Sequence, residues 1–472
     1  MEYGTFFLFA QQADASSGFS LGNFLPFSAL HFLQFAIWGA WYVVLGNYLN
    51  AKGFTRASIG RIYGTMPLGA IISPMLLATV ADKYLNMEVV IGLSHLIGAA
   101  LLVVMSQVNN AKTFFWVALA YALVYSPTLS LANAVVFPHL NNPNHFPYIR
   151  VFGTLGWIAA GLSLKVLIKP DQPMNNRPIL LAAGLSLVLG VYSFSLPATP
   201  PTAEGDALPF VKAISMLSEP TFAVFFGVTL VIAMAMGIYF AFAALFIEQR
   251  AGVKSQNVGP IMTIGQAVEI FFMLSLPWFI ESLGMPVVLA MGVAAWALRF
   301  GCFTAASTGG YFPLILLGVA LHGLCFDFFF AAGFIHVETL SEPTIRASAQ
   351  SLYGVIVYGL GMYLGTEISG WLNQRFTKEE VPAIADVPPV RKTDWRKFWS
   401  IPFVAVTLAM LAFFASLYLI PEPTVPEIDP NAEPAAVVEG EVETEMLTLD
   451  PVVEEGTSEG VEEAPAEVDE TP

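Results

Sequence analysis

The sequence predicts an all-α membrane protein in which twelve transmembrane helices form two six-helix halves. Of its 472 residues, 56% are hydrophobic and only 12% are charged, and the mean hydropathy is +0.66. A water-soluble chain of this size could not cover so much apolar surface with polar groups, so its helices must face lipid. Short polar breaks separate the apolar stretches, and one break near the middle is rich in Pro and small polar residues. These observations favour a multi-pass membrane protein with two halves.

Each predicted span is an apolar stretch long enough to cross the bilayer, which takes roughly 20 helical residues. The spans lie at 26–49, 58–80, 88–106, 113–137, 148–168, 179–197, 219–247, 258–280, 286–306, 312–339, 347–373 and 398–420. The break ATPPTAEGDALP follows Leu196 and separates six spans from six. The predicted division is an N-terminal segment at 1–25, a first half at 26–197, a central cytoplasmic linker at 198–218, a second half at 219–420 and a tail at 421–472.

A short repeat supports the division into halves. The string PYIR at 147–150 opens the fifth span, and PTIR at 343–346 opens the eleventh. These are equivalent places if the second half repeats the first in parallel. Two such halves around a cavity at the bilayer midplane describe the major facilitator fold.

The basic residues bear on orientation. Loops after odd-numbered spans carry many more of them than loops after even-numbered spans, so the positive-inside rule alone would place the termini outside. The two-half architecture favours cytoplasmic termini, and we place both there, in a multi-pass protein of the cell (inner) membrane. The string ADK at 81–83 lies in the loop where transporters of this superfamily use acidic and basic residues to hold the halves together.

The net charge of −16 comes from the tail. Residues 421–472 carry 17 acidic and no basic residues, which leaves 20 basic and 19 acidic residues in the rest of the chain. Such a segment is expected to be disordered and solvated. It either keeps the protein soluble or contacts a partner, and the second possibility is the basis of one alternative function, a non-transporting membrane receptor.

Nothing in the sequence predicts an enzyme. We find no phosphate-binding loop, no metal-ligand spacing and no nucleophile paired with a base, so we expect neither a metal nor a cofactor. Cys302 and Cys325 both fall inside predicted spans, where they are expected to be free buried thiols.

Two carboxylates lie within predicted spans, Glu269 in the eighth and Asp327 in the tenth. A charge at the centre of a span costs at least ~2.5–3.5 kcal/mol, so it is normally kept to bind a polar solute, pair with a cation or carry a proton. Gln266 shares a helical face with Glu269 because the two are three residues apart. An amide beside a carboxylate suits a hydroxyl-rich or heterocyclic ligand; alternatively, the pair only joins helices.

Other polar and aromatic residues follow the same helical spacing. On the tenth span, His322 and Phe326 are four residues apart and Asp327 follows. We expect Phe326 to stack on a ligand and Asp327 to accept hydrogen bonds or a proton. His322 is predicted either as a site residue or as a hydrogen-bonded structural residue.

The fifth span carries Arg150, Thr154 and Trp157 on one stripe. Arg150 either faces the cavity and pairs with a carboxylate of the other half or extends to the membrane interface. Gln34 lies on the first span with Trp38 and Trp41 at the same spacing, and its amide favours a cavity position. The polar residues that we expect to be structural or interfacial are His31, His95, His336, Arg299 and Glu338.

The sequence resembles the bacterial nucleoside–proton symporters of the major facilitator superfamily. The matching strings are FLQFAIWGAWYVVLGNYL at 32–49, ASIG at 57–60, VADKYL at 80–85, YSPTLSLAN at 125–133, FPYIRVFGTLGW at 146–157, GQAVE at 265–269 and FDFFFAAGFIHVETLSEPTIRASAQ at 326–350. They are spread over the first eleven spans, so the resemblance covers nearly all of the chain except its tail.

The resemblance implies a nucleoside pocket lined by Arg150, Thr154, Gln266, Glu269, Phe326 and Asp327. Where well-known members have amides on the seventh helix, this chain has Gly237, Tyr239 and Phe240, and where they have a tyrosine it has His322. We add Trp157, His322, Gln34 and Phe240 to the predicted substrate-binding residues. Asp327 and Glu269 are the predicted proton carriers.

The resulting hypothesis is nucleoside import by proton symport through alternating access, by a monomer that needs no cofactor and binds no nucleic acid. Protonation of a buried carboxylate removes the cost of its charge and allows the loaded carrier to reorient. An alternative hypothesis within transport is a porter for another hydroxylated solute, such as a sugar or a modified nucleoside.

Overall fold

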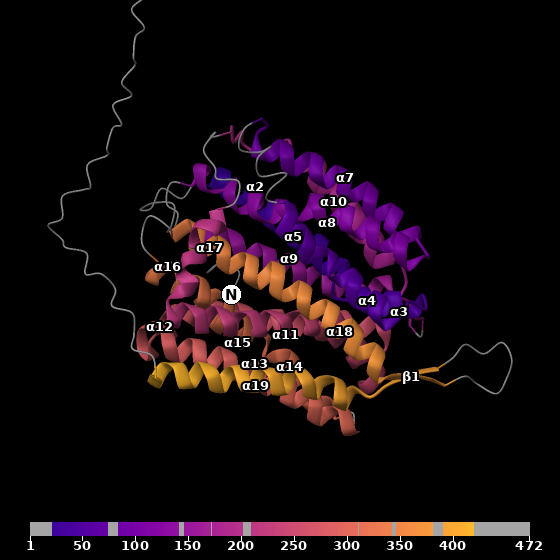
Figure 1. The fold of residues 1–472 in the computed structure, drawn as a ribbon. Helices are drawn as coiled ribbons and strands as arrows, with labels where there is room; N and C mark the ends of the chain where they lie inside the picture. The colour runs from indigo at the N-terminus through magenta and orange to yellow at the C-terminus, as the bar shows by residue number, and fades with distance from the viewer. Residues whose placement is uncertain are drawn as a thin grey trace, which may run out of the picture. The chain divides into compact units, whose positions relative to one another are not determined.

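Helices make up most of the described residues in the computed structural model, and they fall into two groups along the chain (Figure 1). The structure describes residues 21–73, 84–140, 146–170, 172–201, 209–309, 311–341, 346–380 and 390–419. The first group, indigo to purple in Figure 1, lies over the second, which runs from magenta to yellow.

The first half contains α2 (Leu21–Trp41), α3 (Leu45–Ala51), α4 (Arg56–Tyr63), α5 (Thr65–Ser73), α7 (Met87–Gln107), α8 (Ala111–Ala134), η2 (Phe137–His139), α9 (Phe146–Leu167) and α10 (Arg177–Ser193). Here α2 packs on α9 and α10, α7 packs on α8 and α10, and α5 packs on α8. The start of α8 is fixed by Asn110, whose side chain accepts hydrogen bonds from the backbone N–H groups of Lys112 and Thr113.

The second half contains η4 (Pro209–Ser218), α11 (Pro220–Ala251), α12 (Ser255–Leu283), α13 (Met285–Gly309), α14 (Phe312–Ala320), α15 (His322–Cys325), η5 (Phe326–Ala331), α16 (Ala332–Leu340), α17 (Arg346–Gly354), η6 (Val355–Gly361), α18 (Met362–Phe376), β1 (Thr377–Glu380), β2 (Val390–Thr393) and α19 (Trp395–Leu419). The long helix α11 packs on α18 and α19. It begins with Pro220, which is well suited to the first turn because the backbone N–H that proline lacks would have no partner within the helix there. It ends just before Gly252, whose φ of 63° favours glycine.

The predicted membrane fold is confirmed. Nine helical stretches among the described residues are long and apolar enough to cross a membrane. The other three predicted spans, at 58–80, 179–197 and 347–373, are also mostly helical where they are described, although α10 ends at Ser193, four residues before the predicted end of its span. The string at 81–83, the repeat at 343–346 and the acidic tail lie wholly or mostly outside the described residues.

Several spans are interrupted, whereas the sequence predicted continuous helices. The first span ends as α2 at Trp41 and resumes as α3 at Leu45. The tenth and eleventh spans each contain a π-helical turn, η5 and η6. A π turn inserts an extra residue into the helical repeat, and such turns are frequent at functional sites.

A β-hairpin that the sequence did not predict joins the eleventh and twelfth spans. Its strands β1 and β2 are antiparallel, with Thr377 opposite Thr393 and Glu380 opposite Val390. The hairpin carries Arg391, which donates hydrogen bonds to the backbone carbonyls of Phe54 (2.8 Å) and Gly53 (3.2 Å) in the first half. It therefore ties the second half to the first.

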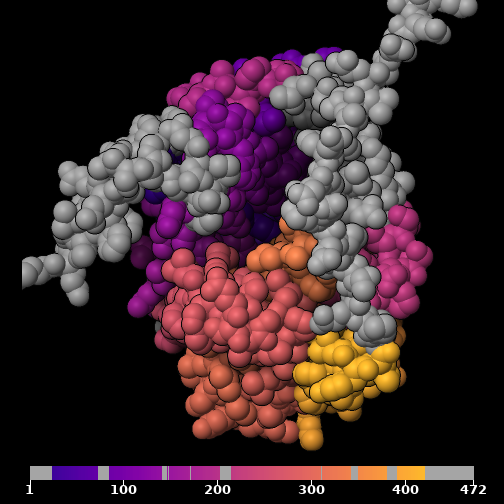
Figure 2. Space-filling view, turned by 90° about the vertical axis from the view of Figure 1, so that its left-hand side faces the viewer, coloured from indigo at the N-terminus to yellow at the C-terminus, as the bar shows by residue number. Residues whose placement is uncertain are grey.

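The two halves touch closely at the end of the molecule that holds α3, α4 and the hairpin, hereafter the closed end (Figure 1). The Asn47 amide donates to Glu248 Oε2 at 2.5 Å, and the backbone N–H of Arg56 donates to Gln374 Oε1 at 3.1 Å. The opposite face is hollowed between the two halves (Figure 2). The structure is thus open on one face and shut on the other.

Small residues permit this closure, because a Cβ atom added to Gly60 would lie 2.5 Å from Gly370 Cα and from the Thr366 carbonyl oxygen. We expect Gly60→Ala to hold the closed end apart. Overpacking costs about 1–3 kcal/mol, which corresponds to roughly a 5- to 150-fold loss of the closed population. Transport that depends on this closure should fall accordingly. Gly227→Ala is the matched control, because a Cβ atom there meets nothing within 4 Å. Equal transport by both variants at equal membrane abundance would contradict the prediction.

Candidate functional site

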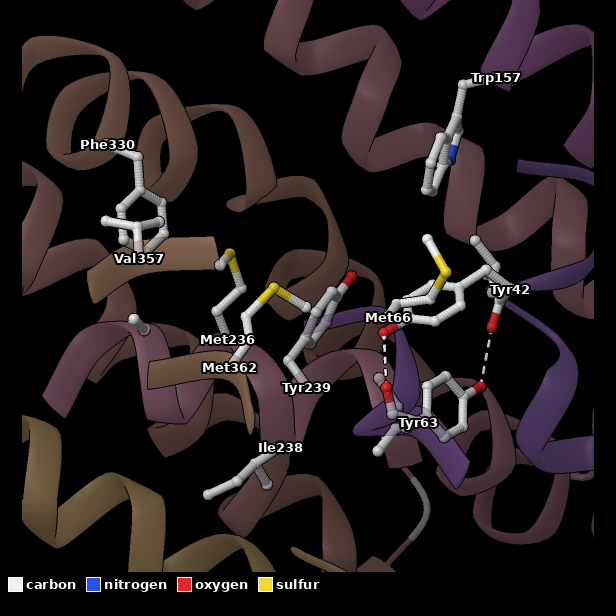
Figure 3. Close-up of a cluster of buried hydrophobic side chains, with 14 of the residues drawn as sticks. Tyr42, Tyr63, Met66, Trp157, Met236, Ile238, Tyr239, Phe330, Val357 and Met362 are labelled. Atoms are coloured by element: carbon white, nitrogen blue, oxygen red, sulfur yellow. Dashed lines mark hydrogen bonds between the residues drawn. The ribbon is translucent and has the colours of Figure 1, made fainter. Parts of the chain in front are cut away.

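A cavity of about 570 Å³ lies between the halves. Helices α2, α5, α8 and α9 of the first half line it, together with α11, α12, α15, α16, α17 and α18 and both π turns of the second. Figure 3 shows Trp157 and Met66 of the first half on one side and Met236 and Met362 of the second on the other. Its lining is thus largely apolar, with a few polar groups, as in typical small-molecule sites.

The carboxyl group of Glu269 reaches the cavity from α12. Gln266, one turn earlier, lines the cavity beside it. The imidazole Nε2 of His322 lies 3.6 Å from Glu269 Oε2. Gln266 Oε1 and His322 Nδ1 have no hydrogen-bond partner among the described residues. These three side chains therefore form a polar group with bonding capacity to spare for a ligand.

Asp327 lies in the π turn η5 and is 0% exposed. It is not among the cavity-lining residues, although its neighbour Phe326 is. Neither of its carboxyl oxygens has a hydrogen-bond partner among the described residues, and Phe328 and Phe329 beside it are fully buried. It interacts electrostatically with Glu269. Asp327 is thus an enclosed carboxyl group next to the cavity, without the partners that a buried charge requires.

Arg150 lines the cavity from α9, together with Thr154 and Trp157. Its guanidinium lies 4.1 Å from the centroid of the Phe35 ring and interacts electrostatically with Glu269 of the other half. Arg150 thus faces the cavity, which is the first of the two positions considered for it.

A family model described as "Nucleoside H+ symporter" matches residues 23–420. The chain belongs to the nucleoside H⁺ symporter family. It is 32% identical to the xanthosine permease of Escherichia coli over 82% of this chain and 94% of that protein. It is 30% identical to the nucleoside permease NupG of the same species over 85% of this chain and 97% of that one. The crystal structure of nucleoside transporter NupG superposes with a TM-score of 0.73 at 28% identity, covering 84% of this chain and 99% of that chain.

The protein is therefore a proton-coupled membrane transporter of the major facilitator type and not an enzyme, as the sequence predicted. Among the described residues, no group of three or more His, Cys, Asp or Glu could hold a metal ion.

Two further predicted residues take different positions in the symporter. Phe240 lines the cavity from α11, next to the His322 ring. Gln34 is fully buried and is not among the lining residues. Its amide donates to Thr128 Oγ1 at 2.8 Å, and its Oε1 lies 2.8 Å from His95 Nε2. Both ends of the Gln34 side chain are thus occupied by other helices of the first half.

Two more residues with polar groups line the cavity: Tyr358, which the sequence patterns did not single out, and Trp38, which shares the helical spacing of Gln34 on the first span. Tyr358 enters from the π turn η6 and interacts electrostatically with Arg150, Glu269 and Asp327. Trp38 lines the cavity with an indole N–H that has no hydrogen-bond partner among the described residues. In the sequence, Tyr358 is a tyrosine within a glycine-rich span. Tyrosines in such spans also serve in ordinary helix packing, so the sequence did not predict its place in the cavity lining.

The residues that we expected to be structural lie outside the cavity lining. His31 contacts Asn133 at 3.2 Å, His336 packs on Phe225, and Glu338 accepts a hydrogen bond from Gln350. Arg299 is fully buried against aromatic rings.

Proposed function

We propose that this symporter imports nucleosides with protons by alternating access, and that the central cavity is the shared binding site. The observation that carries the proposal is the juxtaposition, between two halves, of Arg150 with Glu269 and the enclosed carboxyl group of Asp327. Nucleosides combine a planar base with ribose hydroxyls, so they suit a cavity that offers both rings and polar groups.

The residues have distinct proposed roles. Trp157 and Phe326 offer aromatic surface to the base, and Gln266 and Glu269 offer an amide and a carboxylate to hydroxyl or ring-nitrogen groups. Thr154, Arg150, His322 and Phe240 complete the site. Asp327 or Glu269 takes up the proton, and neutralising a buried charge allows the loaded protein to reorient.

The same proposal sets the orientation. Helix α2 begins and α19 ends on the left of Figure 1, and this side faces the viewer in Figure 2, where it is hollowed between the halves. With cytoplasmic termini, this structure is therefore open to the cytoplasm and closed outward. We place the protein in the inner membrane as a monomer of two six-helix halves that needs no cofactor beyond the proton gradient.

Uptake of radiolabelled uridine, adenosine and xanthosine by a transport-deficient host tests the proposal. We expect at least one nucleoside to accumulate, and a protonophore to abolish the accumulation. A gradient of one pH unit drives about tenfold accumulation per proton, because 1.4 kcal/mol is a factor of ten. Accumulation that a protonophore leaves unchanged would show that the coupling is not to protons.

A second candidate substrate class is another hydroxylated solute, such as a sugar or a modified nucleoside. It is favoured by the aromatic and imidazole groups of Phe240 and His322 at the cavity wall. A thermal-shift panel of nucleosides, nucleobases and sugars on the purified protein separates the two classes, since a ligand that binds only the folded state raises its melting temperature. Stabilisation by sugars and by no nucleoside would favour the second.

A further inference from the structure

Arg299 is a buried cation whose hydrogen-bonding groups are only partly satisfied among the described residues. Its side chain in α13 is 0% exposed, and its Nε donates to the backbone carbonyl of Gly318 at 2.9 Å. Its two terminal nitrogens have no hydrogen-bond partner among the described residues. A guanidinium in that position is costly, and packing alone would be better served by an apolar side chain.

The guanidinium instead lies against two rings. Its central carbon is 4.3 Å from the centroid of Tyr239 and 4.7 Å from that of Trp296, as in cation–π contacts. Tyr239 is itself buried in α11 and is not among the cavity-lining residues. Arg299 therefore fixes the Tyr239 ring from behind the cavity wall.

The Tyr239 ring in turn contacts the imidazole of His322. Their centroids are 5.9 Å apart and their planes differ by 21°. The Phe326 ring also stacks on His322, at 5.7 Å and 30°. These two near-parallel rings restrict rotation of the imidazole, whose Nε2 faces Glu269 Oε2 at 3.6 Å. A continuous set of contacts thus leads from Arg299 to a carboxylate in the cavity.

We propose that Arg299 and Tyr239 are positioning residues that hold the His322 imidazole against Glu269 and thereby set the ligand affinity of the cavity. This inference rests on the proposed function only for its ligand; the positioning itself is a property of the empty protein. The Tyr239 ring, rather than its hydroxyl group, carries the effect, because the contact with His322 is one of stacked planes.

Chemical modification of His322 tests the positioning without any substrate. Diethyl pyrocarbonate acylates accessible neutral imidazole nitrogens, and peptide mass mapping of the full-length purified protein reports His322 separately. We expect Tyr239→Leu to raise the rate at His322 severalfold and Tyr239→Phe to bring it back near the wild-type rate. Phe222→Leu removes another buried ring of α11 and should leave the rate unchanged. An unchanged rate in Tyr239→Leu overturns the positioning role.

Binding measurements test the consequence. We expect Tyr239→Leu to weaken nucleoside binding roughly tenfold, within the range that contacting side chains show in double-mutant cycles. In a His322→Ala background the same change should have no further effect. Equal weakening in both backgrounds would mean general loosening and would overturn the link to His322. If the wild type binds no nucleoside, the proposed function fails while the modification rates still decide the positioning.

Variants of Arg299 complete the test. Arg299→Lys keeps a cation beside Tyr239 and should retain more of the His322 protection than Arg299→Met, which removes the charge. Equal rates of His322 modification in the two Arg299 variants would show that the charge has no part in the positioning. Where Arg299→Met fails to insert into the membrane, the Tyr239 variants decide alone.

Discussion

Replacing Asp327 with asparagine should abolish proton-driven accumulation of nucleoside while leaving exchange across the membrane intact. Asp327 is fully enclosed, and neither of its oxygens has a hydrogen-bond partner among the described residues. Asparagine resembles the neutral acid, so the variant should still reorient, but it has no proton to release. Glu269→Gln should instead weaken binding most, because Glu269 lines the cavity beside Gln266.

Membrane vesicles with an imposed pH gradient separate these effects. The measured quantities are the accumulation ratio and the rate of exchange of internal for external nucleoside. For Asp327→Asn we expect an accumulation ratio near unity with exchange retained. For Glu269→Gln we expect a higher nucleoside concentration at the half-maximal rate of exchange. An Asp327→Asn variant that still concentrates nucleoside would move the proton-carrying role to Glu269.

The positions of several cavity residues could be predicted from helical spacing alone. Arg150, Thr154 and Trp157 recur at intervals of four and three residues, and all three line the cavity. Gln266 and Glu269 do so as well. This works because long regular helices keep one face toward the same neighbours over several turns.

Spacing was less informative where the helix is irregular or where polar groups satisfy one another. Asp327 follows Phe326 directly, yet only Phe326 reaches the cavity wall, in a span that contains a π turn. Gln34 carries an amide of the kind that binds polar ligands. In the structure, however, this amide forms hydrogen bonds with Thr128 and His95 of other spans. Such a partnership depends on tertiary packing and leaves no local sequence signal.

The hairpin also escaped prediction. Its sequence is typical of a long polar loop, because strands of four residues are too short to show a clear alternation of apolar and polar residues. The contact of Arg391 with the carbonyls of Gly53 and Phe54 depends on residues more than 300 positions apart. Closure of one end of the molecule is therefore a property of the folded chain that composition does not report.

The second large effect is expected at Arg150, a cation that lines the cavity from the first half. Arg150→Ala removes its interaction with Glu269 across the halves. A coupling of ~1.4 kcal/mol between the two charges corresponds to about a tenfold fall in the rate of uptake at low nucleoside concentration. Arg150→Lys should recover only part of the loss, because an ammonium group lacks the planar fork of a guanidinium.

Initial rates of uptake, normalised to the amount of protein in the membrane, decide the matter. Lys165→Ala is the matched control: it removes an exposed cation from the same helix, outside the cavity lining. A residue that only anchored α9 at the interface would tolerate both Arg150 substitutions, as Lys165 should tolerate alanine. If Arg150→Ala took up nucleoside at the wild-type rate, Arg150 would have no role in the site, and Glu269 would act without its charge. A loss in Arg150→Ala with partial recovery in Arg150→Lys would place the charge pair between the halves, where its making and breaking can accompany alternating access.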